Sequence, residues 1–242
     1  SRYTCTEKRA LASRPEVGLA KITLELLNGA GEVVQTWHSN QLVKVRDPKP
    51  ADRREGANGG STPRLESLWD GPPGPAPSRT SNFYEDRVVG ETFDLGSHTL
   101  TREEVIDFAR KYDPQPFHLD DDAAARTYFG RLSASGWHTA ALFIRQFVAF
   151  RQGIEREMRE RGLHVAHYGP SPGFKSLRWL KPVYPGDTLT LRGRTAAKID
   201  LKSRPDRGLI QTDSQARNQH GEVVFAIRGQ ILAERREPFR PA

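Results

Sequence analysis

Residues 113–144, DPQPFHLDDDAAARTYFGRLSASGWHTAALFI, decide how the rest of the chain is organised. The stretch begins with Asp113 and His118, which lie in a loop that also contains Pro114 and Pro116. Each proline fixes its own φ angle and favours an extended conformation in the residue before it, so we expect a stiff loop rather than a helix. A carboxylate and an imidazole within reach of one water molecule can move its proton near neutral pH. The loop therefore has the residue types of a catalytic site.

The second half of the stretch predicts two helices. Asp120 is placed to cap a short helix over residues 121–128. A longer helix is expected over residues 137–150, because the run TAALFIRQFVAF is apolar almost all round, which is typical of a buried helix. The first amides of a helix have no acceptor within it, and Gly136 has no side chain to cover its N–H. This amide is therefore suited to stabilise a developing oxyanion.

These residues resemble the signature of one protein family. Asp113, four further residues, His118, and then Gly136 at the start of a helix resemble the MaoC-like, or hydratase-2, branch of the hot-dog fold. Both flanks agree, since FYEDRVVGETF at 83–93 resembles the first strand of the family and RWLKPVYPGDTL at 178–189 resembles the strand and turn after its central helix. The resemblance implies an α+β hot-dog fold, in which an antiparallel sheet wraps round a central helix.

The resemblance also implies an activity, the reversible hydration of a trans-2-enoyl-CoA to an (R)-3-hydroxyacyl-CoA. Asp113 and His118 would bind the water and deliver its two parts, while the Gly136 amide would hold the thioester oxygen. Acid and base are not assigned separately, because coupled groups titrate as a pair. Judged by spacing alone, Asp113 is a turn residue and His118 a satisfied buried histidine; the glycine and the flanks favour catalysis.

Five further residues are candidates for substrate binding. Ser135 and His138 flank the start of the helix and either contact the thioester or only cap the helix, with capping the safer interpretation. Trp137 is expected in the core rather than as a ligand platform. Arg178 and Lys181 are candidates for the phosphates of coenzyme A, because a basic side chain pairs directly with phosphate. Exposed charges on strands are common, which is the alternative for these two.

Two rival functions remain open. A thioesterase on the same fold would cleave the thioester, and a non-catalytic acyl-CoA binding module would keep the pocket without the chemistry. The Asp-His pair argues against both. No redox or metal cofactor is implied. His164 and His167 lie close together in the sequence without a carboxylate or third ligand, so a metal site is not expected there. Hot-dog units usually pair edge to edge, so the resemblance also implies a homodimer.

Composition excludes several other classes of protein. The 242 residues are 36 % hydrophobic and 28 % charged, which is typical of a globular protein. No apolar run is long enough to span a membrane and no leader is visible, so a cytoplasmic protein without a membrane partner is expected. The single cysteine, Cys5, forbids an internal disulfide. The net charge of +7 is spread along the chain without a nucleic-acid-binding motif, so nucleic acid is not expected as a partner.

The N-terminal residues 1–46 contain an internal repeat. The segment from Ser13 aligns without a gap on the segment from Ser203, and about a third of the aligned positions are identical. Both segments predict a hairpin with an Asn-x-x-Gly-Glu turn. Residues 1–46 are therefore interpreted as the C-terminal hairpin of a partial first hot-dog unit, in a fragment of a tandem protein or docked on another unit. Chance similarity between two hairpins is the alternative.

The remaining segments complete the expected architecture. Residues 47–81 are a linker rich in proline and glycine, in which Leu65, Leu68 and Trp69 are candidate anchors. Residues 82–242 form the complete MaoC-like domain. It is expected to contain a capping box at residues 101–104 followed by a helix to residue 112, and five strands over residues 84–95, 174–184, 189–199, 209–217 and 223–234.

Overall fold

The computed structural model describes residues 1–11, 14–46 and 69–240, and the chain forms two compact units, residues 1–61 and 62–242. Leu65 and Leu68 lie outside the described residues. No helix among the described residues is long and apolar enough to cross a membrane.

The N-terminal unit is a three-stranded antiparallel sheet in the order β1-β2-β3. Its strands are β1 (Arg2–Leu11), β2 (Arg14–Leu27) and β3 (Val33–Lys44). The hairpin β2-β3 was expected from the sequence, whereas β1 was not. At the turn, the side-chain oxygen of Asn28 accepts hydrogen bonds from the amides of Ala30 and Glu32, both at 3.0 Å. The side-chain amide of Asn28 also donates to Glu32, so the turn is fixed by one asparagine.

The same three-stranded arrangement recurs in the second unit, in β6 (Thr188–Asp200), β7 (Arg207–Arg217) and β8 (Val223–Glu234). Every residue pair of the hairpin β2-β3, from Val17 with Lys44 onward, matches a pair of β7-β8 at an offset of 190 residues. The pairing of β1 with β2 from Arg2 to Ala10 matches that of β6 with β7 at the same offset, including the irregularity after Cys5. Asn218 accepts from the amides of its turn as Asn28 does. The interpretation of residues 1–46 as a partial hot-dog unit stays a prediction, which this shared register supports.

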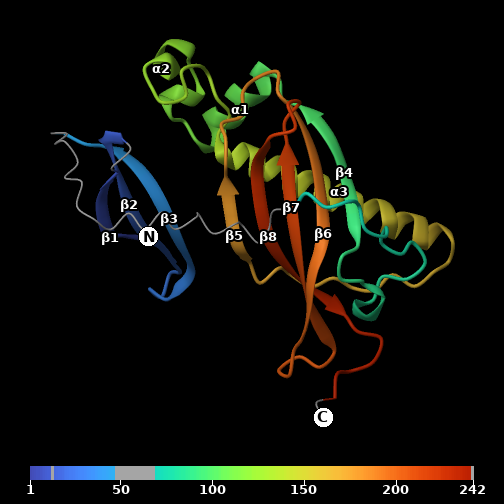
Figure 1. The fold of residues 1–242 in the computed structure, drawn as a ribbon. Helices are drawn as coiled ribbons and strands as arrows, with labels where there is room; N and C mark the ends of the chain where they lie inside the picture. Colours follow the sequence, from blue (N-terminus) through green and yellow to red (C-terminus); the bar gives the residue numbers. More distant parts are fainter. Residues whose placement is uncertain (12–13, 47–68, 241–242) are drawn as a thin grey trace. The chain divides into compact units, whose positions relative to one another are not determined.

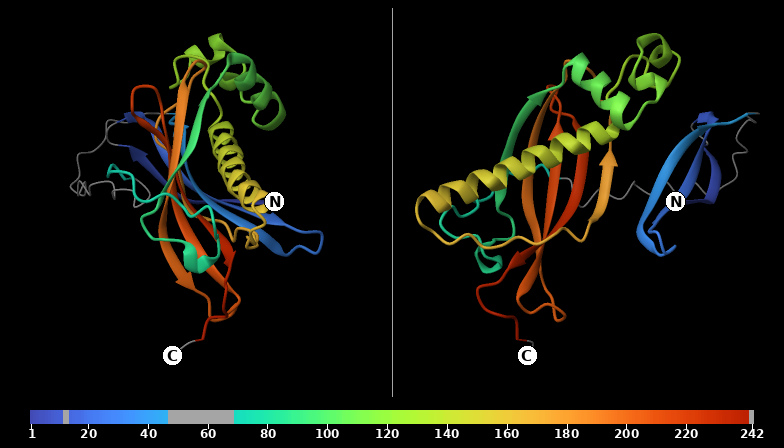
Figure 2. Two further views of the ribbon diagram at one scale, coloured as in Figure 1. Left: turned by 90° about the vertical axis from the view of Figure 1, so that its right-hand side faces the viewer. Right: turned by 180° about the vertical axis from the view of Figure 1, so that it is seen from behind.

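The second unit consists of a sheet and a long helix that covers one of its faces. The sheet is five-stranded and antiparallel in the order β4-β6-β7-β8-β5, with β4 (Thr92–Thr99) and β5 (Phe174–Trp179) at its edges. The helix α3 (Gly136–Glu160) crosses the sheet diagonally, and the shorter helices lie near its N-terminal end (Figures 1 and 2). This is the α+β arrangement expected from the sequence.

The core lies between α3 and the sheet. Leu142 and Phe143 of α3 are buried against strand residues that alternate in and out along the sheet, among them Leu189, Leu191 and Phe225. Ile144 and Val148 lie on the opposite side of α3 and are 52 % and 40 % exposed. The expectation that this helix is buried all round is therefore wrong, because the sheet covers only one side of it.

Three element boundaries also differ from the sequence prediction. The strand expected from residue 84 begins only at Thr92, after a 3-10 turn, η1 (Tyr84–Asp86). The carboxylate of Asp86 accepts hydrogen bonds from Phe83 N at 3.1 Å and from the Ser81 hydroxyl, and such local bonds compete with a strand ladder. The helix capped by Asp120, α2 (Asp121–Ala125), is shorter than expected. The strand expected over residues 174–184 ends at Trp179, because Pro182 has no amide hydrogen to donate to a strand ladder.

Trp69, the one candidate linker anchor that the structure describes, is buried in the second unit. Its ring lies about 5 Å from the guanidinium groups of Arg192 and Arg194. Its carbonyl oxygen accepts hydrogen bonds from Arg192 and from Gln215, both at 3.2 Å. These contacts hold Trp69, within the linker, on β6 and β7.

Candidate active site

The loop between the first helix and α2 holds the carboxylate of the site. The helix α1 (Arg102–Tyr112) begins at the predicted capping box, in which Thr101 and Glu104 bond each other's backbone amides. Asp113 ends this helix, and its amide donates to Ala109 O at 2.9 Å. The following prolines stop the helix, and the chain makes a single 3-10 turn, η2 (Pro116–His118). The position of Asp113 is therefore set by a capped helix on one side and a stiff turn on the other.

His118 is buried and its ring orientation is fixed by one strong hydrogen bond. Its Nδ1 lies 2.7 Å from the carbonyl oxygen of Ser133. A carbonyl accepts only, so Nδ1 carries the hydrogen and Nε2 of the neutral ring is the free acceptor. This Nε2 lies 3.6 Å from Oδ2 of Asp113, which is too long for a direct hydrogen bond. Both atoms are placed to contact the same small molecule.

Ser135 links the carboxylate to the start of α3. Its hydroxyl donates to Asp113 Oδ2 at 2.7 Å and accepts from Trp137 N at 3.1 Å. The prediction that Ser135 caps the helix is confirmed. The second carboxylate oxygen, Oδ1, accepts from the side-chain amide of Gln115 at 2.8 Å. Both oxygens of Asp113 therefore have fixed donors, which hold the carboxylate in one orientation.

Gly136 is the first residue of α3, where backbone amides lack a partner within the helix. The indole of Trp179 lies against it and donates to Gly136 O at 2.6 Å. A Cβ atom at position 136 would lie 2.7 Å from two atoms of this ring, closer than real Cβ contacts. The glycine is therefore required by the close approach of Trp179, in addition to any role of its N–H.

Trp137 and His138 differ in their surroundings. Trp137 is 44 % exposed and meets Trp179 edge to face, with ring centroids 5.1 Å apart, so its expected place in the core is wrong. The reason is that Trp137 lies on the side of α3 that the sheet does not cover. His138 stacks on Phe108 at 4.5 Å, and burial lowers the pKa of its imidazole. Neither residue is part of the Asp-His pair.

Arg178 and Lys181, the two candidates for the coenzyme phosphates, are exposed. Lys181 forms an ion pair with Glu222 in the turn between β7 and β8. Within the described ranges, Arg178 has no ion pair, so its guanidinium is available to a ligand. Their roles stay predictions. Of the two close histidines, His164 stacks on a phenylalanine and His167 contacts Arg207, and the described residues contain no cluster of three metal-ligating groups.

Three residues that shape the site were not predicted from the sequence: Ser133, Gln115 and Trp179. Trp179 was visible only as part of the RWLKPVYPGDTL flank. Ser133 contacts His118 through its backbone carbonyl, a group that every residue has, so the residue type at position 133 does not indicate this contact. Gln115 lies inside the loop motif, but its contact with Asp113 depends on the turn that the prolines impose.

The antiparallel sheet with α3 across one face is a hot-dog fold, and Asp113, His118 and Gly136 lie together at the start of that helix. The model of the MaoC like domain matches residues 85–215, more than half of the chain. The chain therefore belongs to the MaoC-like family.

Individual relatives agree with this assignment. The chain is 33 % identical over 167 residues to the mesaconyl-CoA hydratase of Cereibacter sphaeroides, a match that covers 68 % of this chain and 45 % of that protein. It thus spans less than half the length of this relative. A MaoC-like dehydratase from Rhodospirillum rubrum is 34 % identical, with a TM-score of 0.52 over 67 % of this chain and all of that one.

One solved structure extends over both units. A putative MaoC domain protein dehydratase from Chloroflexus aurantiacus matches 97 % of this chain and 69 % of its own, with a TM-score of 0.65 and 18 % identity. At this identity the match shows a shared fold only.

Proposed function

We propose that the protein catalyses the reversible addition of water to a trans-2-enoyl-CoA, giving an (R)-3-hydroxyacyl-CoA. The observation that carries the proposal is the pair formed by Asp113 Oδ2 and His118 Nε2, 3.6 Å apart at the start of α3. The family membership and the relatives that are called hydratase and dehydratase support the reaction class. The coenzyme A thioester enters as substrate, and no cofactor is part of the proposal.

The pair would position and activate one water molecule. The free Nε2 of the His118 ring and the carboxylate of Asp113 are both acceptors, so each takes a hydrogen bond from the water. The oxygen of the water forms the bond to the β-carbon, and a proton passes through the pair to the α-carbon. Because the two groups lie so close together, the proton is assigned to the pair rather than to one member.

The start of α3 would stabilise the intermediate. As the oxygen adds to the β-carbon, negative charge moves through the α-carbon to the thioester oxygen. The Gly136 N–H and the positive end of the helix dipole favour an anion at this position. Ser135 would act as a positioning residue, because its hydroxyl holds Asp113 Oδ2 at 2.7 Å.

A homodimer is part of the proposal. The edge strand β5 leaves one row of backbone groups unpaired among the described strands, and such edges pair readily with a second copy. Exposed apolar side chains lie on the neighbouring outer face of α3 and on β5: Trp137, Ile144, Val148, Phe174 and Trp179. Burial of these side chains by a second copy would remove a large apolar surface from water.

The experiment is the loss of the enoyl-thioester absorbance with crotonyl-CoA, followed by chiral analysis of the product. Longer and branched enoyl-CoAs are tested in parallel, since the acyl length is not fixed by the proposal. Asp113→Asn and His118→Ala are each expected to lower kcat at least a hundredfold, the range of general acid-base catalysis. Asp107→Asn, an exposed aspartate on the same helix as Asp113, is the matched control and is expected to keep full activity.

The outcomes separate the three candidate functions. Formation of the (R)-3-hydroxyacyl-CoA by the wild-type chain, but not by Asp113→Asn or His118→Ala, supports the hydratase. Release of free thiol would assign a thioesterase instead. Substrates that bind to the folded protein and stay unchanged would leave an acyl-CoA binding module.

A further inference from the structure

The segment of residues 129–134 orients the imidazole of the site. Ser133 lies in this segment, and its carbonyl oxygen accepts the hydrogen bond from His118 Nδ1 at 2.7 Å. The amide of Ala134 donates to Val183 O at 2.8 Å, so the chain between β5 and β6 holds this end of the segment. Because one carbonyl sets the direction of the ring, the orientation of His118 depends on what else holds the segment in place.

Tyr184, the residue after Val183, contacts the other end of the segment. Its hydroxyl donates a hydrogen bond to Phe129 O at 3.1 Å. The guanidinium carbon of Arg131 lies 3.9 Å from the centroid of the tyrosine ring, which is within the range of a cation–π interaction. One partly buried tyrosine therefore contacts the segment at two points, and the hydrogen bond is the more directional of the two contacts.

Tyr184 is itself fixed in a tight turn. Its amide donates to the carboxylate of Asp187 at 2.8 Å, and the amide of Asp187 donates to Tyr184 O at 3.0 Å. The carboxylate of Asp187 also accepts a hydrogen bond from the side chain of Gln219 at 2.9 Å. The amide of Gly186 donates to Leu100 O at 2.7 Å. These bonds join the turn to two other parts of the chain, so the hydroxyl of Tyr184 holds the segment from a fixed position.

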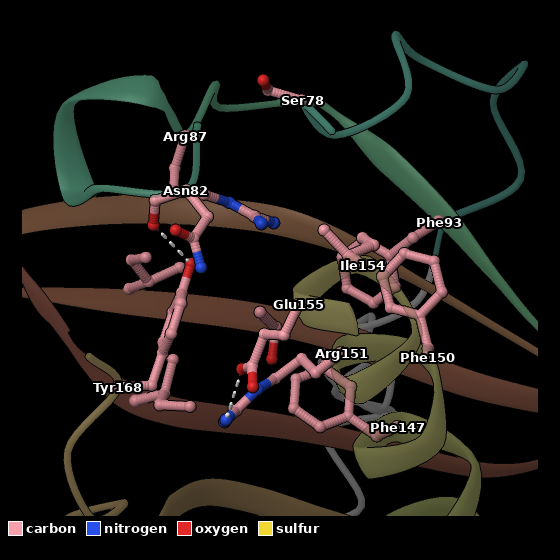
Figure 3. A pocket seen from close by; sticks show the side chains of 13 residues that line it. Ser78, Asn82, Arg87, Phe93, Phe147, Phe150, Arg151, Ile154, Glu155 and Tyr168 are labelled. Carbon is pink, nitrogen blue, oxygen red and sulfur yellow. Dashed lines mark hydrogen bonds and ion pairs between the residues drawn. The ribbon is translucent and has the colours of Figure 1, made fainter. Parts of the chain in front are cut away.

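The ring of Phe129 is part of an aromatic cluster around His118. Its centroid lies 5.9 Å from that of His118 and 5.1 Å from that of Phe117, which meets His118 edge to face at 4.5 Å. These rings are distinct from Phe147 and Phe150, which line a pocket further along α3 (Figure 3). A shift of Phe129 would therefore change the packing of the imidazole directly.

We propose that Tyr184 is a positioning residue for His118, and that its hydroxyl acts through the backbone of Phe129. With this carbonyl held, the ring of Phe129 stays against the imidazole, and the carbonyl of Ser133 stays in line with Nδ1. Nε2 then remains the free acceptor that takes the hydrogen bond from the water. The inference rests on the proposed hydratase function, because it assigns a role within the same site.

The kinetic test is Tyr184→Phe, which removes the hydroxyl and keeps the ring that Arg131 contacts. We expect this variant to lower kcat with crotonyl-CoA about three- to tenfold, the effect of one neutral hydrogen bond. KM is expected to stay within about twofold of the wild-type value, because the hydroxyl is bonded to the protein rather than to the substrate. Tyr84→Phe is the matched control and is expected to keep kcat. The hydroxyl of Tyr84 donates to Asp200 at 3.2 Å, and Asp200 is the last residue of β6, whereas Tyr184 precedes the first.

A second measurement reads the imidazole without any reaction. Nitrogen NMR of the isotope-labelled full chain distinguishes the protonated nitrogen of a neutral imidazole from the bare one. Spectra are recorded at about pH 8, where an ordinary histidine is neutral, and the signals of His118 are assigned by their absence in His118→Ala. The wild type is expected to carry the hydrogen on Nδ1, which faces the Ser133 carbonyl. Tyr184→Phe is expected to show part of the hydrogen on Nε2, whereas Tyr84→Phe is expected to match the wild type.

The outcomes separate this inference from the proposed function. Unchanged kcat or unchanged His118 signals in Tyr184→Phe would overturn the inference. An equal loss of kcat in Tyr84→Phe would overturn it too, because the effect would then be a general one. A wild type without hydratase activity would remove the proposed function, and the NMR comparison would still decide the inference: altered His118 signals in Tyr184→Phe alone support it, and identical signals refute it. Circular dichroism of each variant verifies that it is folded.

Discussion

Replacing Gly136 by alanine tests the packing at the start of the central helix. The added Cβ would lie 2.7 Å from the indole of Trp179, so the ring must move. A displaced ring gives up the 2.6 Å hydrogen bond from its Nε1 to Gly136 O. The substitution therefore acts through one identified neighbour.

The size of the effect follows from three contributions. Overpacking costs about 1–3 kcal/mol, and the lost hydrogen bond costs about 1 kcal/mol. Alanine gains about 1 kcal/mol over glycine in a helix, which offsets part of this loss. We expect Gly136→Ala to lower the free energy of unfolding by roughly 2 kcal/mol. In a Trp179→Ala background the ring is absent, so the same substitution is expected to be neutral or to stabilise by up to about 1 kcal/mol.

The assay is urea denaturation followed by the helical circular-dichroism signal, for the wild type, both single variants and the double variant. The expected coupling between the two positions is about 2–3 kcal/mol. An equal cost of Gly136→Ala in both backgrounds would refute the reasoning, because it would show that Trp179 does not create the requirement for glycine.

Three further predictions concern buried charge, pH and assembly. Asp213 is fully buried and accepts hydrogen bonds from two arginines on β6 and β8, so Asp213→Asn is expected to cost roughly 3 kcal/mol in stability; an unchanged urea midpoint would contradict this. Burial lowers the pKa of His138 below its ordinary 6.5, so the unfolded chain takes up a proton first and stability declines as the pH falls below about 6.5. His138→Phe keeps the stack on Phe108 but does not titrate. We therefore expect a smaller decline of stability with pH for this variant, measured by urea denaturation at several pH values above and below about 6.5. Ile144→Glu places a charge among the exposed apolar side chains of the proposed interface, so we expect it to convert a dimer into a monomer in sedimentation equilibrium. A wild-type chain that is already monomeric would refute the proposed homodimer.

Local sequence signals predicted most elements of the fold because their causes are local. The capping box at Thr101 and Glu104 and the cap at Asp120 both depend on residues within one helical turn, and the structure has both. The strand expected from residue 84 begins only at Thr92, also for a local reason. The carboxylate of Asp86 accepts a hydrogen bond from Phe83 N, which holds this segment in a turn. The strand β1 was missed because its polar side chains give little alternation.

The site was predictable only in part. Asp113, His118, Ser135 and Gly136 were all singled out from the sequence, and the structure brings them to the start of α3. Their relation to Trp179 was not predictable, because 43 residues separate it from Gly136 in the chain.

The sequence by itself determined the type and order of the main elements and marked the loop that contains Asp113 and His118, because prolines, caps and turn residues act on their immediate neighbours. Only the tertiary structure decided which side of α3 is buried, which left Trp137 exposed rather than in the core. It also decided the orientation of His118, through the carbonyl of Ser133, and the contact of Trp179 with Gly136. These features depend on contacts between distant segments, and no property of a single residue encodes them.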